Sequence, residues 1–370
     1  LKPRAAPFAS PACARALPRC GRLVAARGRP RGQASHGTWR SRWSRGFPAL
    51  ACSQALLTAR RRCWSRPGCL RHGSASAVKT RGAVVAEGTQ TGPGYAEALD
   101  REGFVRVPGA VPPEDAGRLL GLLWEDYEVR HGVSRSEPSG WQTKKGRDVR
   151  LYGSPPPTMQ ASSSFDLVVS RLESVANDIL GMGTWRCRAS YTLFVNCPNA
   201  RGRWTVPLGW HTDVEVGPAD PNPKFLYAFA ILDDLGPKGG ATMLLAGSTR
   251  RALATGQVFP QGGQTLKEVL SQDPWFEELF GPAEGGWWAE DLYSPEFAAR
   301  REERFMLQGT TSAGIPMRVV ELLGAAGDIV LWDPRALHSA SDNVSDRPRS
   351  VIRFRLDRTD CVRGEKALRG

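Results

Sequence analysis

The sequence predicts an α+β fold in which a closed or sandwiched antiparallel sheet follows two N-terminal helices. Amphipathic helical patterns come first in the body of the chain, and at least seven short strand-like runs separated by Gly, Pro, Asn and Asp follow them. The length of 370 residues and the hydrophobic content of 41% also suffice for one large domain or two medium ones with a sizeable core.

The first 85 residues differ from the rest of the chain in charge. Residues 1–86 contain 18 of the 50 Lys and Arg residues and no acid, whereas 87–370 contain 32 basic and 37 acidic residues. A basic segment rich in Arg, Ala, Ser, Pro and Gly is typical of a transit peptide to a mitochondrion or plastid, and a solvated tail or a gene-model artefact are the alternatives. We therefore expect a targeting or disordered segment at 1–85 and a folded domain at 86–370, which without targeting would be cytoplasmic.

Composition also excludes several classes. The excess positive charge lies in the head and the body is mildly acidic, so we expect no nucleic-acid partner. The body has three scattered cysteines, Cys187, Cys197 and Cys361, which form neither a disulfide framework nor a CxxC zinc pattern and favour a reducing compartment. No run of about 18 apolar residues occurs, so we expect no membrane span. The oligomeric state is left open.

The start of the body is predicted to be mostly helical. A short helix is expected at 95–102, ended by Gly103, and a strand at 104–107. A second helix begins at Pro112, because prolines followed by acids suit a helix N-terminus. The polar stretch 132–162 is expected to be a long loop.

The clearest helical pattern covers 163–180, where apolar residues keep the i, i+3, i+4, i+7 spacing of one buried face. Ser163 and Asp166 are the expected N-terminal capping pair, and Gly181 is the expected end.

From residue 185 the apolar period becomes strand-like. The expected strands are 185–196, 208–213, 225–232, 241–245, 317–323, 328–332 and 350–356. The pattern is interrupted at about 250–318, which we interpret as an insertion at the mouth of the sheet structure, with helices near 265–280 and 295–305. Its Trp275, Trp287 and Trp288 either cover the substrate or pack the insertion onto the sheets.

The segment Gly209-Trp-His-Thr-Asp213 suggests a metal site. On a strand, His211 and Asp213 would point to the same face. An HxD triplet alone is weak, since most histidines are ordinary core or surface residues, but His338 adds a second imidazole. Two imidazoles and one carboxylate on one face of octahedral Fe(II) leave three positions for a chelating co-substrate and O2.

Arg349 is the candidate for binding that co-substrate. It stands 11 positions after His338 and leads into the last expected strand, so a tight loop could return it to the metal pocket. A guanidinium would bind the far carboxylate of a dicarboxylic 2-oxo acid bidentately. By residue pattern alone Arg347, Arg353 and Arg355 remain alternatives. Tyr191 and Asn196, on the strand before the HxD, are candidate hydrogen-bond partners of the co-substrate.

Six ordered motifs resemble the phytanoyl-CoA dioxygenase-like family. They are FVRVPGAVPP at 104–113, WHTD at 210–213, LDD at 232–234, GGATMLLAGS at 239–248, GD at 327–328, and His338 with Asn343-Val-Ser345 and Arg349. The resemblance covers about 95–357 apart from the insertion. Two departures are Ala246 and Thr249, where the family usually has Pro and His, and the long separation of 127 residues between His211 and His338.

The resemblance implies a double-stranded β-helix (jelly-roll, cupin-like) barrel with the N-terminal helices packed on it. It implies Fe(II) held by His211, Asp213 and His338, with 2-oxoglutarate as co-substrate and Arg349 on its distal carboxylate. The implied activity is hydroxylation of an unactivated C–H bond of a lipid-like or secondary-metabolite small molecule by O2, since related halogenases have a small residue in place of Asp213. The alternatives are a catalytically silent cupin-like metal- or ligand-binding protein and nucleic-acid binding through the head. The substrate stays open.

Overall fold

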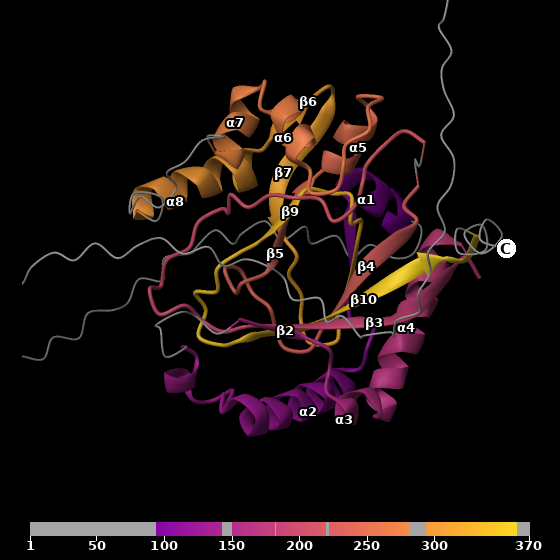
Figure 1. Ribbon diagram of the computed structural model, residues 1–370, viewed down its shortest axis with the longest axis vertical. Coiled ribbons are helices and arrows are strands. Elements are labelled where there is room, and N and C mark those ends of the chain that lie inside the picture. The colour runs from indigo at the N-terminus through magenta and orange to yellow at the C-terminus, as the bar shows by residue number, and fades with distance from the viewer. Residues whose placement is uncertain (1–93, 143–149, 182, 220–221, 282–293, 361–370) are drawn as a thin grey trace, which may run out of the picture. The chain divides into compact units, whose positions relative to one another are not determined.

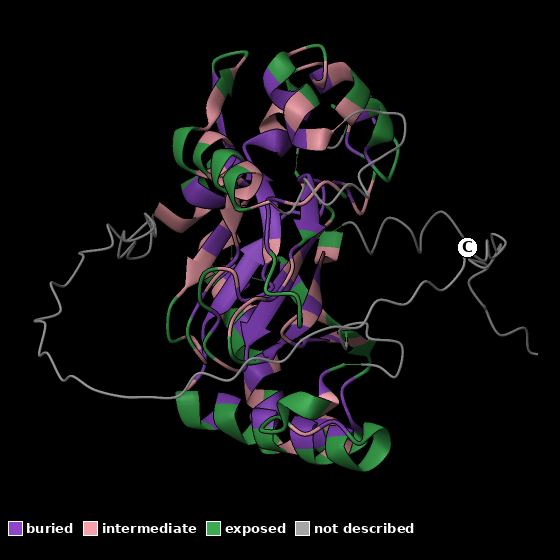
Figure 2. Ribbon diagram, turned by 90° about the vertical axis from the view of Figure 1, so that its left-hand side faces the viewer, coloured by how far each residue is buried: buried purple, intermediate pink, exposed green. Residues whose placement is uncertain are grey.

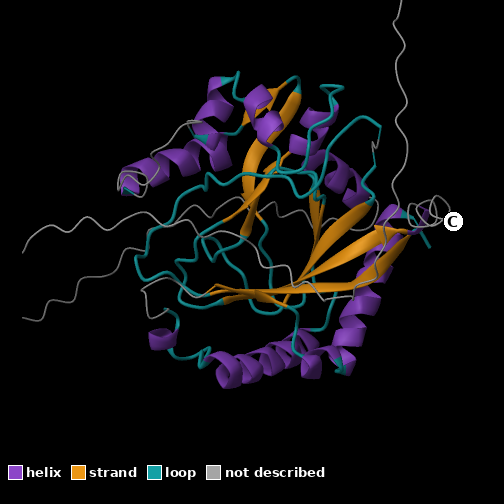
Figure 3. Ribbon diagram, in the orientation of Figure 1, coloured by secondary structure: helices purple, strands orange, loops and turns teal. Residues whose placement is uncertain are grey.

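The computed structural model describes residues 94–142, 150–181, 183–219, 222–281 and 294–360. The expected transit peptide, Trp287 and Trp288 lie outside these residues. Two antiparallel sheets face each other, and helices α2, α3 and α4 lie along one side of the larger sheet (Figures 1 and 3). Within the described part of the chain, no helix is both long enough and apolar enough to cross a bilayer.

The order of the strands confirms the double-stranded β-helix. The strands are β1 (Phe104–Val107), β2 (Arg150–Gly153), β3 (Trp185–Asn196), β4 (Phe225–Ile231), β5 (Thr242–Ala246), β6 (Thr310–Ser312), β7 (Ile315–Glu321), β8 (Ile329–Trp332), β9 (His338–Ala340) and β10 (Arg349–Arg358). The larger sheet has the order β1-β8-β4-β10-β3-β2 and the smaller one β6-β7-β5-β9. From β3 to β10 the chain crosses repeatedly between the sheets, which is the jelly-roll connection.

The helices lie mainly before β3 and between β5 and β6. They are α1 (Gly94–Glu102), α2 (Pro113–His131), η1 (Pro138–Gly140), α3 (Pro157–Gln160), α4 (Ser163–Leu180), α5 (Ser248–Leu253), α6 (Gln264–Leu270), α7 (Pro274–Phe280), α8 (Pro295–Glu302) and the π-helical turn η3 (Glu303–Gln308). The N-terminal helices and the helical insertion are therefore both present.

The alternation of side chains along β10 separates two cores. Ile352 and Phe354 point outward and pack with the buried faces of α2 and α4, including Leu119 and Leu172. Val351 points the other way, into a core between the two sheets. Burial of each large apolar side chain contributes about 1.5–3 kcal/mol, and buried residues run through both sheets (Figure 2).

Helix α4 begins at Ser163 as expected, but the expected capping pair is wrong. Ser162 is the N-cap, because its Oγ accepts a hydrogen bond of 3.3 Å from the backbone N of Phe165. The Oγ of Ser164 donates to Asp115 of α2 at 2.7 Å and so ties the two helices together. Gly181 ends the helix with φ of 115°, as expected.

Several expected loops and strands differ from the structure. The expected loop at 132–162 contains β2, a short edge strand whose exposed side chains give no hydrophobic alternation. The expected strand at 208–213 is irregular except for a single bridge between His211 and His338. The three-residue strands β6 and β9 were not expected, because three residues carry no period that a sequence can show.

The motifs at 104–113 and 327–328 brace β1 against β8. The buried carboxylate of Asp328 accepts hydrogen bonds from Arg106 Nε at 2.7 Å and from the backbone N of Gly109 at 2.8 Å. The backbone N of Val111 donates to Gly327 O at 2.9 Å, and a Cβ on Gly327 would lie 2.2 Å from Val111 O. These residues therefore have structural roles.

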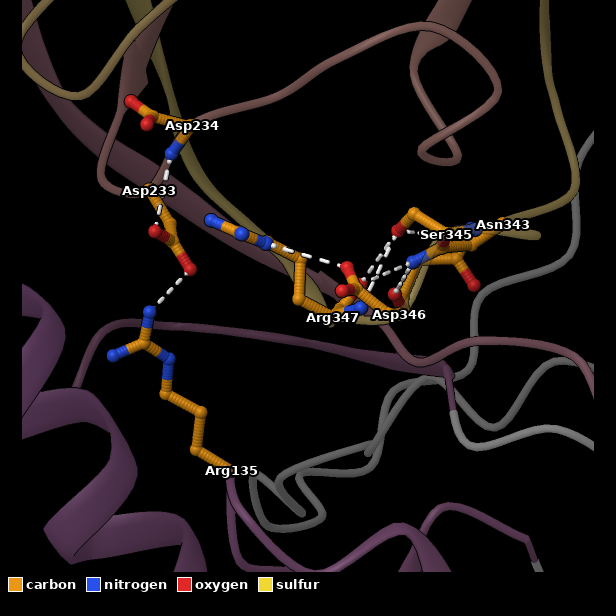
Figure 4. Close-up of polar contacts among 8 residues, drawn as sticks. Arg135, Asp233, Asp234, Asn343, Ser345, Asp346 and Arg347 are labelled. Atoms are coloured by element: carbon orange, nitrogen blue, oxygen red, sulfur yellow. Dashed lines mark hydrogen bonds and ion pairs between the residues drawn. The ribbon is translucent and has the colours of Figure 1, made fainter. Parts of the chain in front are cut away.

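The LDD motif is structural as well. Asp233 accepts a hydrogen bond of 2.5 Å from Arg135, in the segment that follows α2 (Figure 4). Asp234 accepts one of 3.0 Å from the backbone N of Ala326. The two carboxylates thus fasten the turn after β4 to its neighbours.

The segment between β5 and β6 is held together from inside by Arg301. This fully buried guanidinium donates to Glu278 O at 2.8 Å and Leu279 O at 2.9 Å, which are the last carbonyls of α7. It also donates to Val206 O at 3.3 Å, in the stretch that leads to the HxD. Burial lowers the pKa of Arg301 to about 10. Trp275 is buried in the same core, so this tryptophan packs the segment onto the smaller sheet.

Glu321, at the end of β7, is a partly buried acid whose contribution to the stability of the fold should depend on pH. Its two carboxylate oxygens accept hydrogen bonds of 3.0 and 3.2 Å from the backbone N of Lys238. Burial raises its pKa to about 7, and the neighbouring Glu302 adds to the shift. Since the folded-state pKa lies above the ordinary value of 4.5, the folded state holds this proton more tightly than the unfolded chain. The resulting stability is present at low pH and is lost as pH rises toward about 7.

We therefore expect Glu321→Gln to stabilise the protein at about pH 8 relative to wild type and to have no such effect at about pH 5. The gain should appear as a rise in melting temperature of roughly 2–4 °C for each kcal/mol, measured by calorimetry at both pH values. Glu137→Gln changes an exposed acid and is the control. A gain at pH 5 that equals or exceeds the gain at pH 8 would contradict the expectation.

Candidate metal centre

The structure brings His211, Asp213 and His338 together. One ligand atom from each residue lies within 4.8 Å of the others, so the three could hold a metal ion. Asp213 Oδ1 lies 3.7 Å from His211 Nε2, and Asp213 Oδ2 lies 3.7 Å from His338 Nε2. Two nitrogens and one oxygen facing a common point match the donor set that the sequence predicts.

Backbone hydrogen bonds fix the positions of the three residues. His211 N donates to His338 O at 3.0 Å, and His338 N donates to His211 O at 2.9 Å, so the two histidines form a hydrogen-bonded antiparallel pair. Asp213 N donates to Pro334 O at 3.0 Å. The turn that carries Pro334 is held by a buried ion pair of 2.8 Å between Asp333 and Arg335.

Both imidazoles are oriented by the carbonyl two residues earlier in the chain. His211 Nδ1 lies 3.1 Å from Gly209 O, and His338 Nδ1 lies 3.0 Å from Ala336 O. A carbonyl can only accept, so each Nδ1 carries the proton and each Nε2 presents its lone pair toward Asp213. Burial lowers the pKa of His338 to about 4, which keeps this imidazole neutral, as metal binding requires.

Two polar residues of the larger sheet lie next to Asp213, and neither contact was predicted from the sequence. The hydroxyl of Tyr227, on β4, is an electrostatic neighbour of the Asp213 carboxylate, and burial is the main cause that raises the pKa of this tyrosine. Nη1 of Arg353, on β10, lies 3.7 Å from Asp213 Oδ2. The alternation of Phe225, Tyr227 and Phe229 along β4 is a signal that could have identified Tyr227 as an inward-facing residue.

Aromatic rings form a wall beside the three residues. Trp332, on β8, meets His338 edge-on with ring centroids 4.7 Å apart. Its ring also packs on Tyr227 at 5.0 Å and on Phe229 at 5.7 Å. These rings exclude water from one side of the site, which strengthens electrostatic interactions there.

Arg349 lies buried between the sheets, directly across the β3–β10 ladder from Asn196. Its Nη1 donates to Gly240 O at 2.8 Å and its Nη2 to Thr242 Oγ1 at 3.2 Å. Nε of Arg349 and Oδ1 of Asn196 have no hydrogen-bond partner in the described part of the chain. Burial lowers the pKa of Arg349 to about 10, and no carboxylate of the described residues forms an ion pair with it. A buried cation of this kind requires an anionic partner.

Asn343 stabilises the loop that connects His338 to Arg349. Its Nδ2 donates to Asn196 O at 2.8 Å and to Arg347 O at 2.9 Å, while its Oδ1 accepts from Ser345 Oγ at 2.7 Å. Arg347, one of the alternatives to Arg349, turns toward Asp346 at 3.5 Å and is half exposed (Figure 4). The loop therefore directs Arg349, and not Arg347, to the inside.

Tyr191 is not brought to the site. Its ring packs edge-on against Phe165 of α4 at 4.9 Å and against Phe354 at 5.3 Å, on the outer face of the larger sheet. The structure thus places Tyr191 and Asn196 on opposite faces of β3, and only Asn196 lies near Arg349.

A sequence model of the phytanoyl-CoA dioxygenase (PhyH) family matches residues 99–351. Comparison with curated protein sequences gives no match. Similar solved structures include the epimerase SnoN in complex with Fe3+, alpha ketoglutarate and nogalamycin RO, at 18% identity and a TM-score of 0.40 over 71% of this chain and 82% of SnoN. The carbocyclase SnoK from nogalamycin biosynthesis has 17% identity and a TM-score of 0.45 over 71% and 83% of the two chains. EctD from S. alaskensis has 17% identity and a TM-score of 0.39 over 72% and 76%.

Proposed function

Because the chain belongs to the phytanoyl-CoA dioxygenase (PhyH) family of Fe(II)- and 2-oxoglutarate-dependent oxygenases, we propose that it hydroxylates an unactivated C–H bond of a small molecule. The proposed substrate is lipid-like or a secondary metabolite, and O2 is the oxidant. The observation that carries the proposal is the cluster of His211, Asp213 and His338, whose donor atoms converge on one point.

The three residues would hold Fe(II) through both Nε2 atoms and one oxygen of Asp213. Two imidazoles and a carboxylate on one face suit Fe(II) and leave positions for a chelating ligand and O2. When bound, iron and 2-oxoglutarate would activate O2, so that one oxygen atom enters succinate, which is formed together with CO2, and the other enters the substrate. Asp213 favours hydroxylation over halogenation, because its carboxylate takes the coordination position that a halide would need.

Arg349 is proposed to bind the distal carboxylate of 2-oxoglutarate. The buried guanidinium has a free Nε and no ion-pair partner among the described residues, so an incoming carboxylate would compensate its charge. Asn196 stays a candidate for a weaker contact, since its Nδ2 makes only a long hydrogen bond of 3.3 Å to Ser341 O. Gly240 keeps this end of the pocket open, because a Cβ there would lie 2.5 Å from Asn196 Nδ2.

We propose further that the catalytic domain is 86–370 and that 1–85 is dispensable for it. Within the domain, the insertion at about 250–318 would influence which substrate enters. Its helices α6 and α7 pack with the smaller sheet, and Arg301 of α8 connects α7 to Val206, in the stretch that precedes the HxD.

Anaerobic addition of Fe(II) and 2-oxoglutarate to the full chain should give the visible charge-transfer absorption of 2-oxoglutarate chelated to Fe(II). Exposure to O2 should then yield succinate, and a true substrate from a panel of acyl-CoA thioesters, fatty acids, amino-acid derivatives and secondary metabolites should accelerate it. Iron binding without consumption of 2-oxoglutarate across this panel would favour the catalytically silent alternative.

A further inference from the structure

We propose that Arg353 binds an oxyanionic group of the substrate, a carboxylate or a phosphate, beside the metal. This inference rests on the proposed function and adds a substrate class to it. It rests on the position of Arg353, its unused hydrogen-bond donors and the charges around it.

Along β10, Arg353 lies next to the proposed metal position and away from Arg349. Both residues point inward from β10, but four residues of strand separate their backbones by about 13 Å. Nη1 of Arg353 lies 3.7 Å from Asp213 Oδ2, so the guanidinium is next to the proposed iron. A group bound by Arg353 would therefore lie beside the centre at which oxidation takes place.

The guanidinium of Arg353 is held in place, but most of its N–H groups are available as hydrogen-bond donors. It lies over the ring of Tyr227, 4.3 Å from the centroid, and 5.3 Å from the centroid of Phe194. Of its five N–H groups, one is engaged by Thr192 Oγ1 at 3.3 Å within the described residues, since the 3.7 Å approach to Asp213 is too long for a hydrogen bond. Its side chain is 26% exposed, so an incoming ligand can reach it.

Asp213 will not remain a full counter-ion for Arg353 once metal is bound. Its carboxylate would then be a metal ligand, and its charge would be shared with the metal. The site would therefore present Arg353 with its positive charge largely uncompensated. A planar guanidinium pre-oriented on an aromatic ring binds planar oxyanions with little loss of conformational entropy.

The neighbouring arginines Arg355 and Arg188 already share a carboxylate that is not a proposed metal ligand, which distinguishes Arg353 from them. Arg355 donates to Asp357 at 2.5 Å, and Arg188 lies 3.7 Å from the same carboxylate. On this part of the inner face, three arginines thus meet two described carboxylates, and one of these two is the metal ligand Asp213. An anionic substrate would be attracted here, whereas a cationic one would be repelled.

The test uses the full chain loaded anaerobically with Fe(II) and 2-oxoglutarate. The probes are butanoate and decanoate, the corresponding primary amides, and butyl and decyl phosphate. Binding is followed by the change that each probe causes in the charge-transfer absorption. We expect at least one anionic probe to bind at least tenfold more tightly than the amide of the same chain length. Comparing the carboxylates with the phosphates then identifies the preferred oxyanion.

Arg353→Gln should remove this preference and leave the affinity for 2-oxoglutarate within about twofold of wild type. Arg353→Lys should keep part of the preference, because it keeps the charge but not the fork. Arg188→Gln removes an equal charge from the same inner face and should keep the preference. Circular dichroism and Co(II) binding verify that each variant is folded.

Three results would overturn the inference. Equal binding of the anions and amides by the wild type is the first. A preference that survives in Arg353→Gln is the second. The third is a large loss of 2-oxoglutarate or iron affinity in Arg353→Gln, which would assign the residue to the co-substrate or to the positioning of Asp213. Failure of the proposed function itself would appear earlier, as the absence of charge-transfer absorption before any probe is added, and would overturn both proposals.

Discussion

Replacing His211 with alanine is expected to abolish succinate formation by the protein loaded with Fe(II) and 2-oxoglutarate. His211 supplies one of three proposed ligands, and its Nε2 is aimed by the contact of Nδ1 with Gly209 O at 3.1 Å. The loss should be at least about a thousandfold, or about 4 kcal/mol of transition-state stabilisation. Succinate should be quantified by chromatography, and Co(II) affinity measured by titration should fall with it.

His131→Ala is the matched control. His131 ends α2 and is exposed, with its ring 5.3 Å from that of Tyr127, so its removal should leave both iron affinity and succinate formation unchanged. Normal succinate formation by His211→Ala would show that the metal, if bound, is held elsewhere.

Replacing Arg349 with leucine should weaken the binding of 2-oxoglutarate and spare the binding of metal. The truncation removes one partner of a buried, hydrogen-bonded charge pair, which costs about 2–5 kcal/mol. The dissociation constant of 2-oxoglutarate should therefore rise by about 30-fold to several thousandfold. Titration of the charge-transfer absorption measures this constant, and Co(II) affinity reports whether the three ligands are intact.

The neighbouring arginine provides the comparison for this variant. Arg347→Leu removes the same kind of side chain two residues earlier, but Arg347 is exposed and pairs with Asp346, so 2-oxoglutarate affinity should not change. Arg349→Lys should bind 2-oxoglutarate with intermediate affinity, because a lysine keeps the charge and loses the bidentate geometry. If Arg349→Leu and the wild type bound 2-oxoglutarate equally tightly, Arg349 would not be part of the co-substrate site.

The long regular elements could be predicted from the sequence, because their patterns extend over several periods. Helix α4 spans the predicted 163–180, and β3 spans the predicted 185–196. The grouping of His211, Asp213 and His338 could also be predicted, although 208–213 is not a strand. The single bridge between the two histidines and the contact of Asp213 N with Pro334 O replace the regular ladder that the prediction assumed.

The sequence could not predict which surroundings each arginine of β10 would have. Arg349, Arg353 and Arg355 share one face of β10, so alternation alone does not distinguish them. Their partners do, because Arg349 donates to Gly240 O, Arg353 approaches Asp213, and Arg355 pairs with Asp357. These partners come from strands that are distant in the sequence.

The placement of Tyr191 could have been corrected without a structure. Tyr191 and Asn196 are five residues apart on one strand, so their side chains point to opposite faces and only one of them can face a given pocket. The structure selects Asn196, whose partner across the ladder is Arg349. The neighbouring strand β2 was missed because its four residues show no apolar alternation.

The pairing of β5 with β7 bears on how the chain can change in length during evolution. Ala246 lies opposite Arg318, so the segment between these strands leaves and rejoins the smaller sheet at adjacent points. Parts of this segment that lie away from the HxD can change in length, whereas the hydrogen bond of 2.9 Å from Gly262 N to Thr212 O fixes one point of it beside His211 and Asp213. The loop from His338 to Arg349 is more constrained, because Asn343 donates to both Asn196 O and Arg347 O and so fixes its course. We therefore expect relatives of this chain to differ in length mainly between β5 and β6, and less between His338 and Arg349.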